Sequence, residues 1–222
     1  MKILWIELNN YPINLSYLIK MITIILITIT ALISFAAFNN HSITYNYIFN
    51  ANKIYKDKQW YRFFSSGFLH ADMFHLFFNM YALYLFGRSV ENFLLLKYGD
   101  LFGKILYLFL YISAIAVSSI PDYKKYKFSP SYNALGASGA VSAVIFVCVI
   151  LYPNQGIMIF PIPFFIPSYI FGPIYLAYSY YMAQRNMDNI GHNAHFFGAL
   201  YGIIFIFVIY KDALQNFLHQ IL

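Results

Sequence analysis

Long apolar blocks alternate with short polar segments along this chain. Because a helix rises about 1.5 Å per residue and the hydrocarbon core of a bilayer is about 30 Å thick, a helix that crosses it needs roughly 20 apolar residues. Outer-membrane strands alternate apolar and polar positions instead, unlike these unbroken blocks. The pattern predicts an all-α, polytopic membrane bundle with six transmembrane helices, over residues 15–38, 66–86, 102–120, 138–152, 157–181 and 192–211.

Two polar segments interrupt the apolar pattern, residues 39–62 and 121–135, and we expect both to be loops. The first apolar block is longer than the core of a cleavable signal peptide, which has about 7–15 residues, so it predicts a retained span. The sequence shows no repeat and no separate soluble segment. We therefore expect residues 1–222 to form a single transmembrane domain.

The fourth apolar segment is too short to cross a bilayer alone. From Ser138 to Tyr152 there are about 14 helical steps, or about 21 Å of helix, against a core of about 30 Å. Either the preceding residues 129–137 enter the membrane as irregular backbone, or the segment is not a span. Irregular backbone survives at that depth only where protein or a water-filled cavity satisfies its hydrogen bonds. The first alternative puts Ser138 at a helix N-terminus, roughly 9 Å below the surface and beside a cavity.

Composition excludes a water-soluble protein. The chain is 61% hydrophobic and 10% charged, whereas soluble domains are about 45–50% apolar and about 25% charged. The formal net charge of +6 comes from basic residues scattered over the loops, so we expect no nucleic-acid site. The lone cysteine, Cys148, lies in an apolar run and is predicted to be a small core residue.

Four of the six histidines lie within or at the ends of predicted spans: His70, His75, His192 and His195. Ionisable side chains inside a membrane are costly and mark functional sites by default, although any one of them could simply bond a neighbouring helix. His75 and Asn79 are four residues apart, so both side chains leave one helix face and can converge as hydrogen-bond donors.

Small residues recur one helical turn apart on the fourth and sixth predicted spans: Gly139, Ala143, Gly198 and Gly202. Such faces let two helix backbones approach closely. If these two faces dock, the hydroxyl of Ser138 can come within hydrogen-bond reach of the imidazole of His195. His195 then becomes a plausible general base for a serine nucleophile.

Acyl transfer also needs hydrogen-bond donors for the oxyanion that develops. The backbone N–H of Ser138, at a helix N-terminus, supplies one donor, and His75 and Asn79 can supply the others. The acidic residues nearest in sequence to Ser138 and His195 are Asp122 and Asp188, and both fall in predicted loops. The sequence therefore favours a Ser–His dyad over a triad.

Three stretches together resemble the rhomboid intramembrane serine proteases: residues 67–79 (GFLHADMFHLFFN), 136–140 (GASGA) and 194–202 (AHFFGALYG). The resemblance implies the six-helix rhomboid core, with Ser138 as nucleophile and His195 as base. It also implies that His75 and Asn79 join the Ser138 N–H at the oxyanion hole. The substrates would be transmembrane proteins in the lipid bilayer, and no cofactor or metal is implied.

Further parts of the chain fit this resemblance less closely. The Trp60-Tyr61-Arg62 stretch is similar to the family's Trp-Arg element with one residue inserted, but an aromatic belt residue beside a basic interfacial anchor would look the same. Residues 87–91 are similar to a family pattern near the end of the second span, where we expect Glu91 to be structural. His192 could line the cavity mouth or face lipid headgroups. The sequence has no HExxH motif, so we expect no metal site.

Four prolines interrupt the fifth predicted span: Pro161, Pro163, Pro167 and Pro173. They remove helix hydrogen bonds and bend or loosen the segment, as a gate would require or as a fit to a neighbour would. The resemblance favours substrate passage between the second and fifth spans. A substrate helix must unwind before it is cut, so we expect substrates with weak helix formers near the membrane surface.

The resemblance implies cytoplasmic termini and a site that opens to the opposite side. Six of the 14 Lys and Arg residues would then be cytoplasmic and eight would lie on the other side, which the positive-inside rule mildly disfavours. We expect this orientation nonetheless, because the excess is small. For location we expect the bacterial inner membrane, with a eukaryotic organelle as the alternative.

The sequence leaves two alternatives to an intramembrane serine endopeptidase. A catalytically silent rhomboid-like protein would bind transmembrane clients without cutting them, which the intact Ser138 and His195 disfavour. A small transporter would use the polar cavity, but the sequence has neither an internal repeat nor a carboxylate-lined path. The residues and the resemblance together favour the endopeptidase.

Overall fold

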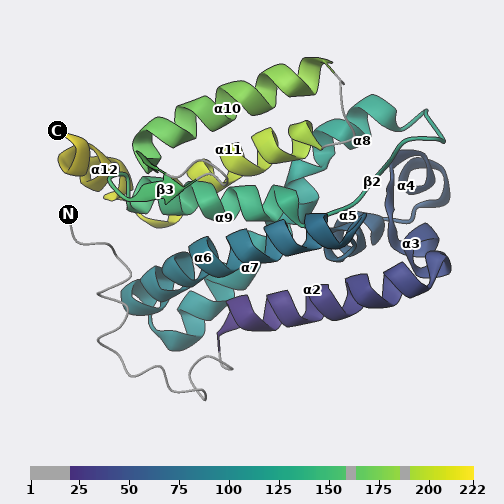
Figure 1. Cartoon of the computed structure of the whole chain (residues 1–222), viewed down its shortest axis with the longest axis horizontal. Coiled ribbons are helices and arrows are strands. Elements are labelled where there is room, and N and C mark those ends of the chain that lie inside the picture. Colours follow the sequence, from purple (N-terminus) through teal and green to yellow (C-terminus); the bar gives the residue numbers. More distant parts are fainter. Residues whose placement is uncertain (1–20, 159–163, 186–190) are drawn as a thin grey trace.

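The structure is a computed structural model that describes residues 21–158, 164–185 and 191–222. Its long helices alternate in direction, so that the chain runs back and forth along one bundle (Figure 1). In chain order these helices are α2 (Ile22–Asn39), α6 (Met73–Tyr98), α7 (Asp100–Ser118), α9 (Ser138–Leu151), α10 (Ser168–Arg185) and α11 (His192–Ile209).

Shorter elements connect the long helices: α3 (His41–Tyr47), α4 (Ala51–Asp57), α5 (Arg62–Ser65), a 3-10 helix (Ser66–Phe68), α8 (Ile120–Tyr126) and α12 (Ala213–Ile221). Two antiparallel strand pairs complete the described part: β1 (Phe49–Asn50) with β2 (Asn133–Ala134), and β3 (Gly156–Met158) with β4 (Phe165–Pro167). Phe49 lies opposite Ala134, and Ile157 lies opposite Ile166. The first pair ties together the two polar segments, at the end of the bundle where α9 and α11 begin (Figure 1).

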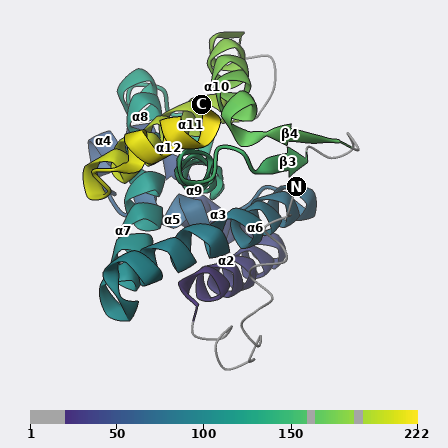
Figure 2. The same ribbon diagram turned by 90° about the vertical axis from the view of Figure 1, so that its left-hand side faces the viewer.

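Helix α9 lies at the centre of the bundle (Figure 2). It packs against α6, α7 and α11, and α10 and α12 also contact it. All of its residues except Ser138 and Ile145 are buried, as expected for a helix that is apolar on every side. Its first residue is Ser138, and Cys148 belongs to its core. The predicted short helix from Ser138 and the core position of Cys148 are therefore confirmed.

Three stretches of the described chain are long and apolar enough to cross a membrane, judged by length and composition: Ile22–Asn39, Asp100–Tyr126 and His192–Ile209. Helix α9 is apolar but shorter. Large apolar side chains on the outside of the bundle, such as Leu96 and Val208, are more than 70% exposed. An outer surface of this kind suits a lipid environment, because in water it would be an aggregation hazard.

The second predicted span has different bounds in the structure. Residues 66–68 form a 3-10 helix, and α6 starts only at residue 73. Asp72 caps α6, because its Oδ1 accepts the N–H of His75 at 2.8 Å. The helix continues past residue 86 to residue 98. At Gly87 the Tyr107 hydroxyl approaches the helix so closely that a Cβ would overlap it.

The prediction of a helix from residue 157 is wrong. Strands β3 and β4 occupy this region, and α10 begins at residue 168. Pro167 ends β4 directly before the helix, a place where its missing N–H costs nothing. Pro173 lies inside α10. Pro161 and Pro163 lie outside the described residues.

The two polar segments are not simple loops, because they contain α3, α4, β1, most of α8 and β2. Arg62 holds the first segment together from inside. It is 2% exposed and donates to the carbonyl oxygens of Tyr45 and Ile48 and to Oε1 of Gln59, at 3.2, 2.7 and 2.6 Å. Trp60 is half exposed. Arg62 is therefore a structural residue of this segment and not an interfacial anchor.

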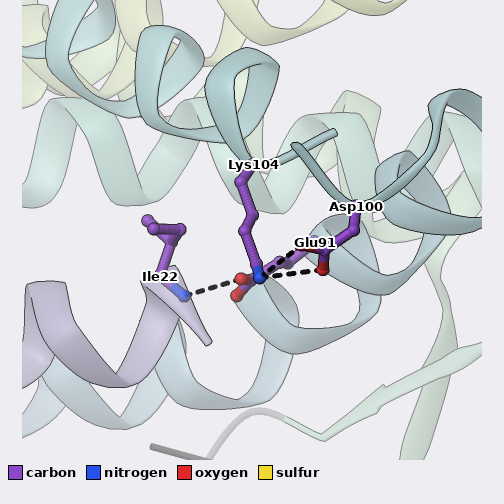
Figure 3. A network of polar contacts seen from close by, with 4 residues as sticks. All are labelled: Ile22, Glu91, Asp100 and Lys104. Carbon is purple, nitrogen blue, oxygen red and sulfur yellow. Dashed lines mark hydrogen bonds and ion pairs between the residues drawn. The ribbon is translucent and has the colours of Figure 1, made fainter. Parts of the chain in front are cut away.

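Glu91 is fully buried on α6 and caps the N-terminus of α2 (Figure 3). Its Oε1 accepts the N–H of Ile22 at 2.6 Å, and its Oε2 accepts the N–H and the hydroxyl of Thr23 at 2.9 and 2.6 Å. The same view shows the ion pair between Lys104 and Asp100, with nitrogen and oxygen 2.8 Å apart. A carboxylate at a helix N-terminus also opposes the helix dipole favourably. The structural role expected for Glu91 is confirmed.

Candidate active site

Helices α9 and α11 meet backbone to backbone along their small residues. A Cβ on Gly198 would overlap the carbonyl group of Gly139, and a Cβ on Gly202 would overlap that of Ala143. Since both pairs are separated by four residues in the same direction, the helices run parallel, with Gly139 level with Gly198. The two small-residue faces therefore dock, which is the condition that the sequence sets for bringing Ser138 near His195.

This docking brings the candidate nucleophile and the candidate base to one end of two adjacent helices. Ser138 directly precedes Gly139 and opens α9. His195 lies in the first turn of α11, one helical turn before Gly198. Both side chains are half-buried, so they are neither sealed in the core nor fully exposed.

An aromatic ring from α10 lies against His195. The ring of Tyr175 stacks on the imidazole with 6.5 Å between ring centroids. The hydroxyl of Tyr175 is 2.8 Å from Oγ of Ser142, which follows Ser138 by one turn on the same face of α9. Helices α9, α10 and α11 therefore adjoin at this point, and Tyr175 limits the positions that the imidazole can take.

His192 belongs to the same ring cluster. It is 5% exposed, and its ring lies edge-on to those of His195 and Tyr178, at centroid distances of 5.9 and 5.7 Å. The alternative in which His192 faces lipid headgroups is therefore wrong. Among the described residues, no group of three or more His, Cys, Asp or Glu side chains is arranged to hold a metal ion.

The chain enters α9 through a loop that is fixed by two hydrogen bonds from backbone N–H groups. The N–H of Gly136 donates to the carbonyl oxygen of Ser66 at 3.0 Å, and the N–H of Ala137 donates to Nε2 of His70 at 3.4 Å. Because Nε2 accepts, the bonding pattern assigns the proton of this imidazole to Nδ1, which lies 3.0 Å from Oγ of Ser34. His70 thus precedes α6 and bridges α2 to this loop.

His75 lies against the same loop. Gly136 has a φ of +124°, and a Cβ there would meet Cε1 and Nε2 of the His75 imidazole at 2.7 and 2.9 Å. The ring therefore occupies the space beside the backbone two residues before Ser138. Asn79 is buried one turn further along α6, and its Nδ2 donates to the carbonyl oxygen of His75 at 2.9 Å. The structure places His75 beside the start of α9, with Asn79 on the same face of α6.

Three helices start at this end of the bundle and run in the same direction, α6, α9 and α11 (Figure 1). The N-terminus of a helix carries a partial positive charge of about half a unit and N–H groups without intrahelical partners. His75, Ser138 and His195 all lie in the first turns of these helices. The arrangement favours negative charge at the place where the three N-termini converge.

Sequence reasoning misplaced Asp122 and did not single out Tyr175. Asp122, expected in a loop, lies in α8 and is 3% exposed. The signal was a single acid in a segment otherwise rich in lysine. Tyr175 gave no signal, because it is one of 22 tyrosines. Asp188 lies outside the described residues.

Comparison with known proteins gives a consistent result. Residues 57–212 match the Rhomboid domain. RHOMBOID-like protein 12, mitochondrial, of Arabidopsis thaliana is 29% identical over 171 residues, which cover 73% of this chain and 50% of that protein. Presenilin-associated rhomboid-like protein, mitochondrial, of Homo sapiens is 29% identical over 151 residues, 64% of this chain and 36% of that protein. Rhomboid-like protein 11, chloroplastic, of Arabidopsis thaliana is 26% identical over 166 residues, 68% of this chain and 53% of that protein.

These alignments leave much of each relative unmatched. The chain spans about half the length of the two Arabidopsis proteins and about a third of the human one. The matched segment, residues 57–212, includes the positions of His75, Asn79, Ser138 and His195.

Proposed function

Because the chain belongs to the rhomboid family, and so is a multi-pass helical membrane protein, we propose that it is an intramembrane serine endopeptidase that cleaves transmembrane segments. The observation that carries the proposal is the contact of α9 with α11 at Gly139 and Gly198. It brings Ser138 and His195 to the same end of adjacent helices. Ser138 acts as nucleophile and His195 as general base, in a dyad.

In the acylation half, Oγ of Ser138 attacks the scissile carbonyl carbon while His195 takes the hydroxyl proton. The tetrahedral intermediate then collapses, the C–N bond breaks, and the imidazolium gives that proton to the leaving amine. In the second half, a water molecule attacks the acyl ester, and His195 carries a water proton to Oγ of Ser138 as the ester bond breaks. The products are a free amine and a carboxylic acid, and Ser138 is regenerated.

The oxyanion of both intermediates needs donors that are already in place. The backbone N–H of Ser138 and the imidazole of His75 supply two of them. An amide group has two N–H donors, and one of those on Asn79 is bonded to His75, so the second serves the oxyanion. Each such donor is worth about 2.7–4 kcal/mol of transition-state stabilisation. The three converging helix N-termini add favourable potential.

The depth of the site follows if all the long helices, α2, α6, α7, α9, α10 and α11, span the membrane. Helix α9 has 14 residues, or about 21 Å of length, so one of its ends lies below the membrane surface. The incomplete burial of Ser138 and His195 supports access of water to that depth. Substrate entry between α6 and α10, which lie on either side of α9 (Figure 2), is supported by Pro173, which interrupts the hydrogen bonds of α10.

We take residues 1–222 as one domain and the bacterial inner membrane as its location. The relatives named above are proteins of mitochondria and chloroplasts by their names. Fractionation of the cells in which the protein occurs naturally, with detection of the protein in each membrane fraction, would decide between these membranes.

The decisive test uses the purified full chain and a single-span substrate protein with Gly or Pro near the membrane surface. Cleavage is compared among wild type, Ser138→Ala and His195→Ala. We expect cleavage by wild type only. Ser129→Ala and His219→Ala serve as matched controls, because Ser129 is only partly buried, His219 is exposed and neither lies in the dyad. Both variants should cleave as wild type does.

Two outcomes would contradict the proposal. Equal cleavage by wild type, Ser138→Ala and His195→Ala would show that other groups or a contaminant do the chemistry. Retained substrate binding with no cleavage by any protein, wild type included, would favour the catalytically silent client-binding protein instead.

A further inference from the structure

A single buried carboxylate joins the two chain segments that lead to Ser138 and His195. Asp122 lies in α8 and is 3% exposed. Its Oδ2 accepts the hydroxyl of Tyr132 at 2.8 Å, and its Oδ1 accepts Nδ2 of Asn193 at 2.7 Å. Both oxygens of the carboxylate are therefore engaged, each by a different segment of the chain.

The two partners of Asp122, Tyr132 and Asn193, each lie a few residues before one member of the proposed dyad. Tyr132 directly precedes β2 and lies six residues before Ser138. Asn193 is the second residue of α11 and lies two residues before His195. We infer that Asp122 is a positioning residue, which fixes the register between the segment that delivers the nucleophile and the helix that delivers the base. The inference rests on the proposed function.

Aromatic contacts hold the ring of Tyr132 in place. The ring of Tyr132 stacks on that of Tyr126, with centroids 3.7 Å apart, and lies edge-on to Phe49 at 6.4 Å. Burial, together with the negative charge of Asp122, raises the pKa of the Tyr132 phenol. The phenol therefore stays protonated at neutral pH and donates to the carboxylate. A bond of this kind, with one charged partner, is stronger than a neutral one.

The hydrogen bond from Asn193 connects Asp122 to the N-terminus of α11. A carboxylate beside that end of a helix is stabilised by the helix dipole, so Asp122 is held at α11 by a field as well as by a hydrogen bond. Helix α8 also contacts α4 and follows α7 after a single residue. The bond to Asn193 therefore ties α11 to α8, and the bond to Tyr132 ties the segment before Ser138 to the same helix.

Asp122 is not assigned a catalytic role, because its two oxygens are occupied by Tyr132 and Asn193. Its effect on the reaction is geometric. Misplacement of reacting groups by about 1 Å can slow a reaction about a hundredfold without weakening substrate binding. Loss of the link should therefore lower kcat and leave KM nearly unchanged.

The test exchanges donor and acceptor across the Asp122–Asn193 bond. Asn193→Asp places two carboxylates face to face, and we expect kcat to fall at least tenfold with KM within twofold of wild type. The double variant Asp122→Asn with Asn193→Asp restores a donor and an acceptor in reversed order, and should recover kcat to within about threefold. Each is measured with the purified full chain, together with the rate at which a small fluorophosphonate labels Ser138.

A second pair of variants keeps the test decisive if Asn193→Asp does not fold. Tyr132→Phe removes only the hydroxyl that Asp122 accepts, and should lower kcat and the labelling rate threefold to tenfold. Tyr126→Phe is the matched control, because it removes a hydroxyl from the ring stacked on Tyr132 without touching the carboxylate, and it should behave as wild type.

The outcomes separate the two claims. An active wild type whose kcat and labelling rate are unchanged in Tyr132→Phe, and in a folded Asn193→Asp, would overturn the role of Asp122 alone. Failure of the double variant to recover, while Asn193→Asp is slow, would also overturn it, since the direct bond would not be the cause. A wild type that neither cleaves nor is labelled would overturn the proposed function, and the role of Asp122 with it.

Discussion

At the scale of single residues, Gly136 is the position with the least freedom near the candidate site. Its φ of +124° is strained for any other residue, and a Cβ would meet the imidazole of His75 at 2.7 and 2.9 Å. Gly136→Ala should therefore cost about 1–3 kcal/mol of stability. It should also push His75 away from the start of α9, so we expect cleavage to slow at least tenfold, measured as kcat with the purified chain.

Gly99→Ala is the matched control for this substitution. Gly99 also has a positive φ, +84°, but a Cβ there would meet nothing within 4 Å. It should lower the thermal midpoint by a similar amount while the kcat of the folded protein stays at the wild-type value. A Gly136→Ala protein that cleaves as fast as Gly99→Ala would show that His75 has no part in catalysis.

Glu91 supports a prediction on stability alone. Removing its charge with Glu91→Gln leaves the N–H groups of Ile22 and Thr23 and the Thr23 hydroxyl to share an amide, which itself carries donors. Since hydrogen bonds to a charged group are worth about 1.5–3 kcal/mol each, we expect a clear drop in the thermal midpoint. Thr23→Val should give a smaller drop, because it removes only one of the three bonds to Glu91, together with the contact between the Thr23 and Tyr107 hydroxyls. Equal midpoints for wild type and Glu91→Gln would mean that the cap contributes nothing.

At the scale of elements, the contact of α9 with α11 controls the site. A Cβ on Gly202 would overlap the backbone carbonyl of Ala143, which cannot move aside as a side chain could. Gly202→Ala should force the helices apart, cost about 1–3 kcal/mol, and slow cleavage because Ser138 and His195 separate. Thermal unfolding and kcat measured on the same preparations test both effects.

Gly172→Ala on α10 controls for the loss of a glycine as such. Its Cβ would lie 3.3 Å from Cγ1 of Val149, a side chain that can adjust, so we expect a change below about 1 kcal/mol and a wild-type cleavage rate. If Gly202→Ala were as harmless as Gly172→Ala, close backbone contact would not be needed for activity.

The elements also show what a sequence can and cannot reveal. Helices α9 and α11 were predictable almost to the residue, because apolar runs bounded by the breaker Pro153 and by polar residues define them. The long extent of α6 was not, since its second half depends on partners from other helices, Tyr107 beside Gly87 and the N-terminus of α2 around Glu91. Its start was marked in the sequence, because Asp72 is a typical N-cap residue.

The candidate site likewise combines residues that the sequence could suggest with residues that it could not. Spacing and resemblance were enough to propose Ser138, His195, His75 and Asn79 as site residues, since each motif is local in sequence. The residues that hold the motifs were not, because their contacts cross the whole chain. Asp122 meets Asn193, 71 residues away, and no spacing rule links such positions.

At the scale of the whole molecule, the alternating helices put the polar segment with α3 and α4 at one end of the bundle and α12 at the other (Figure 1). Ser138 and His195 lie at the first end, which carries the larger number of the basic residues within the described part of the chain. Arg62 belongs to this surplus, yet it is buried and donates to backbone carbonyls. The fold of that segment accounts for Arg62, so this residue is not a surface charge of the kind that the positive-inside rule counts. The rule therefore disfavours the expected orientation less strongly.

We therefore predict that α12 is cytoplasmic and that the dyad opens to the other side. The chain has one cysteine, the buried Cys148, so Cys148→Ala gives a background for single-cysteine labelling. In that background Lys58→Cys, at the end of α4, and Gln215→Cys, on α12, are both exposed positions. In intact bacterial cells a membrane-impermeant maleimide should label Lys58→Cys, and should reach Gln215→Cys only after the membrane is opened. The reverse order would place the dyad on the cytoplasmic side, and the charge bias would then have been the better guide to orientation than the family resemblance.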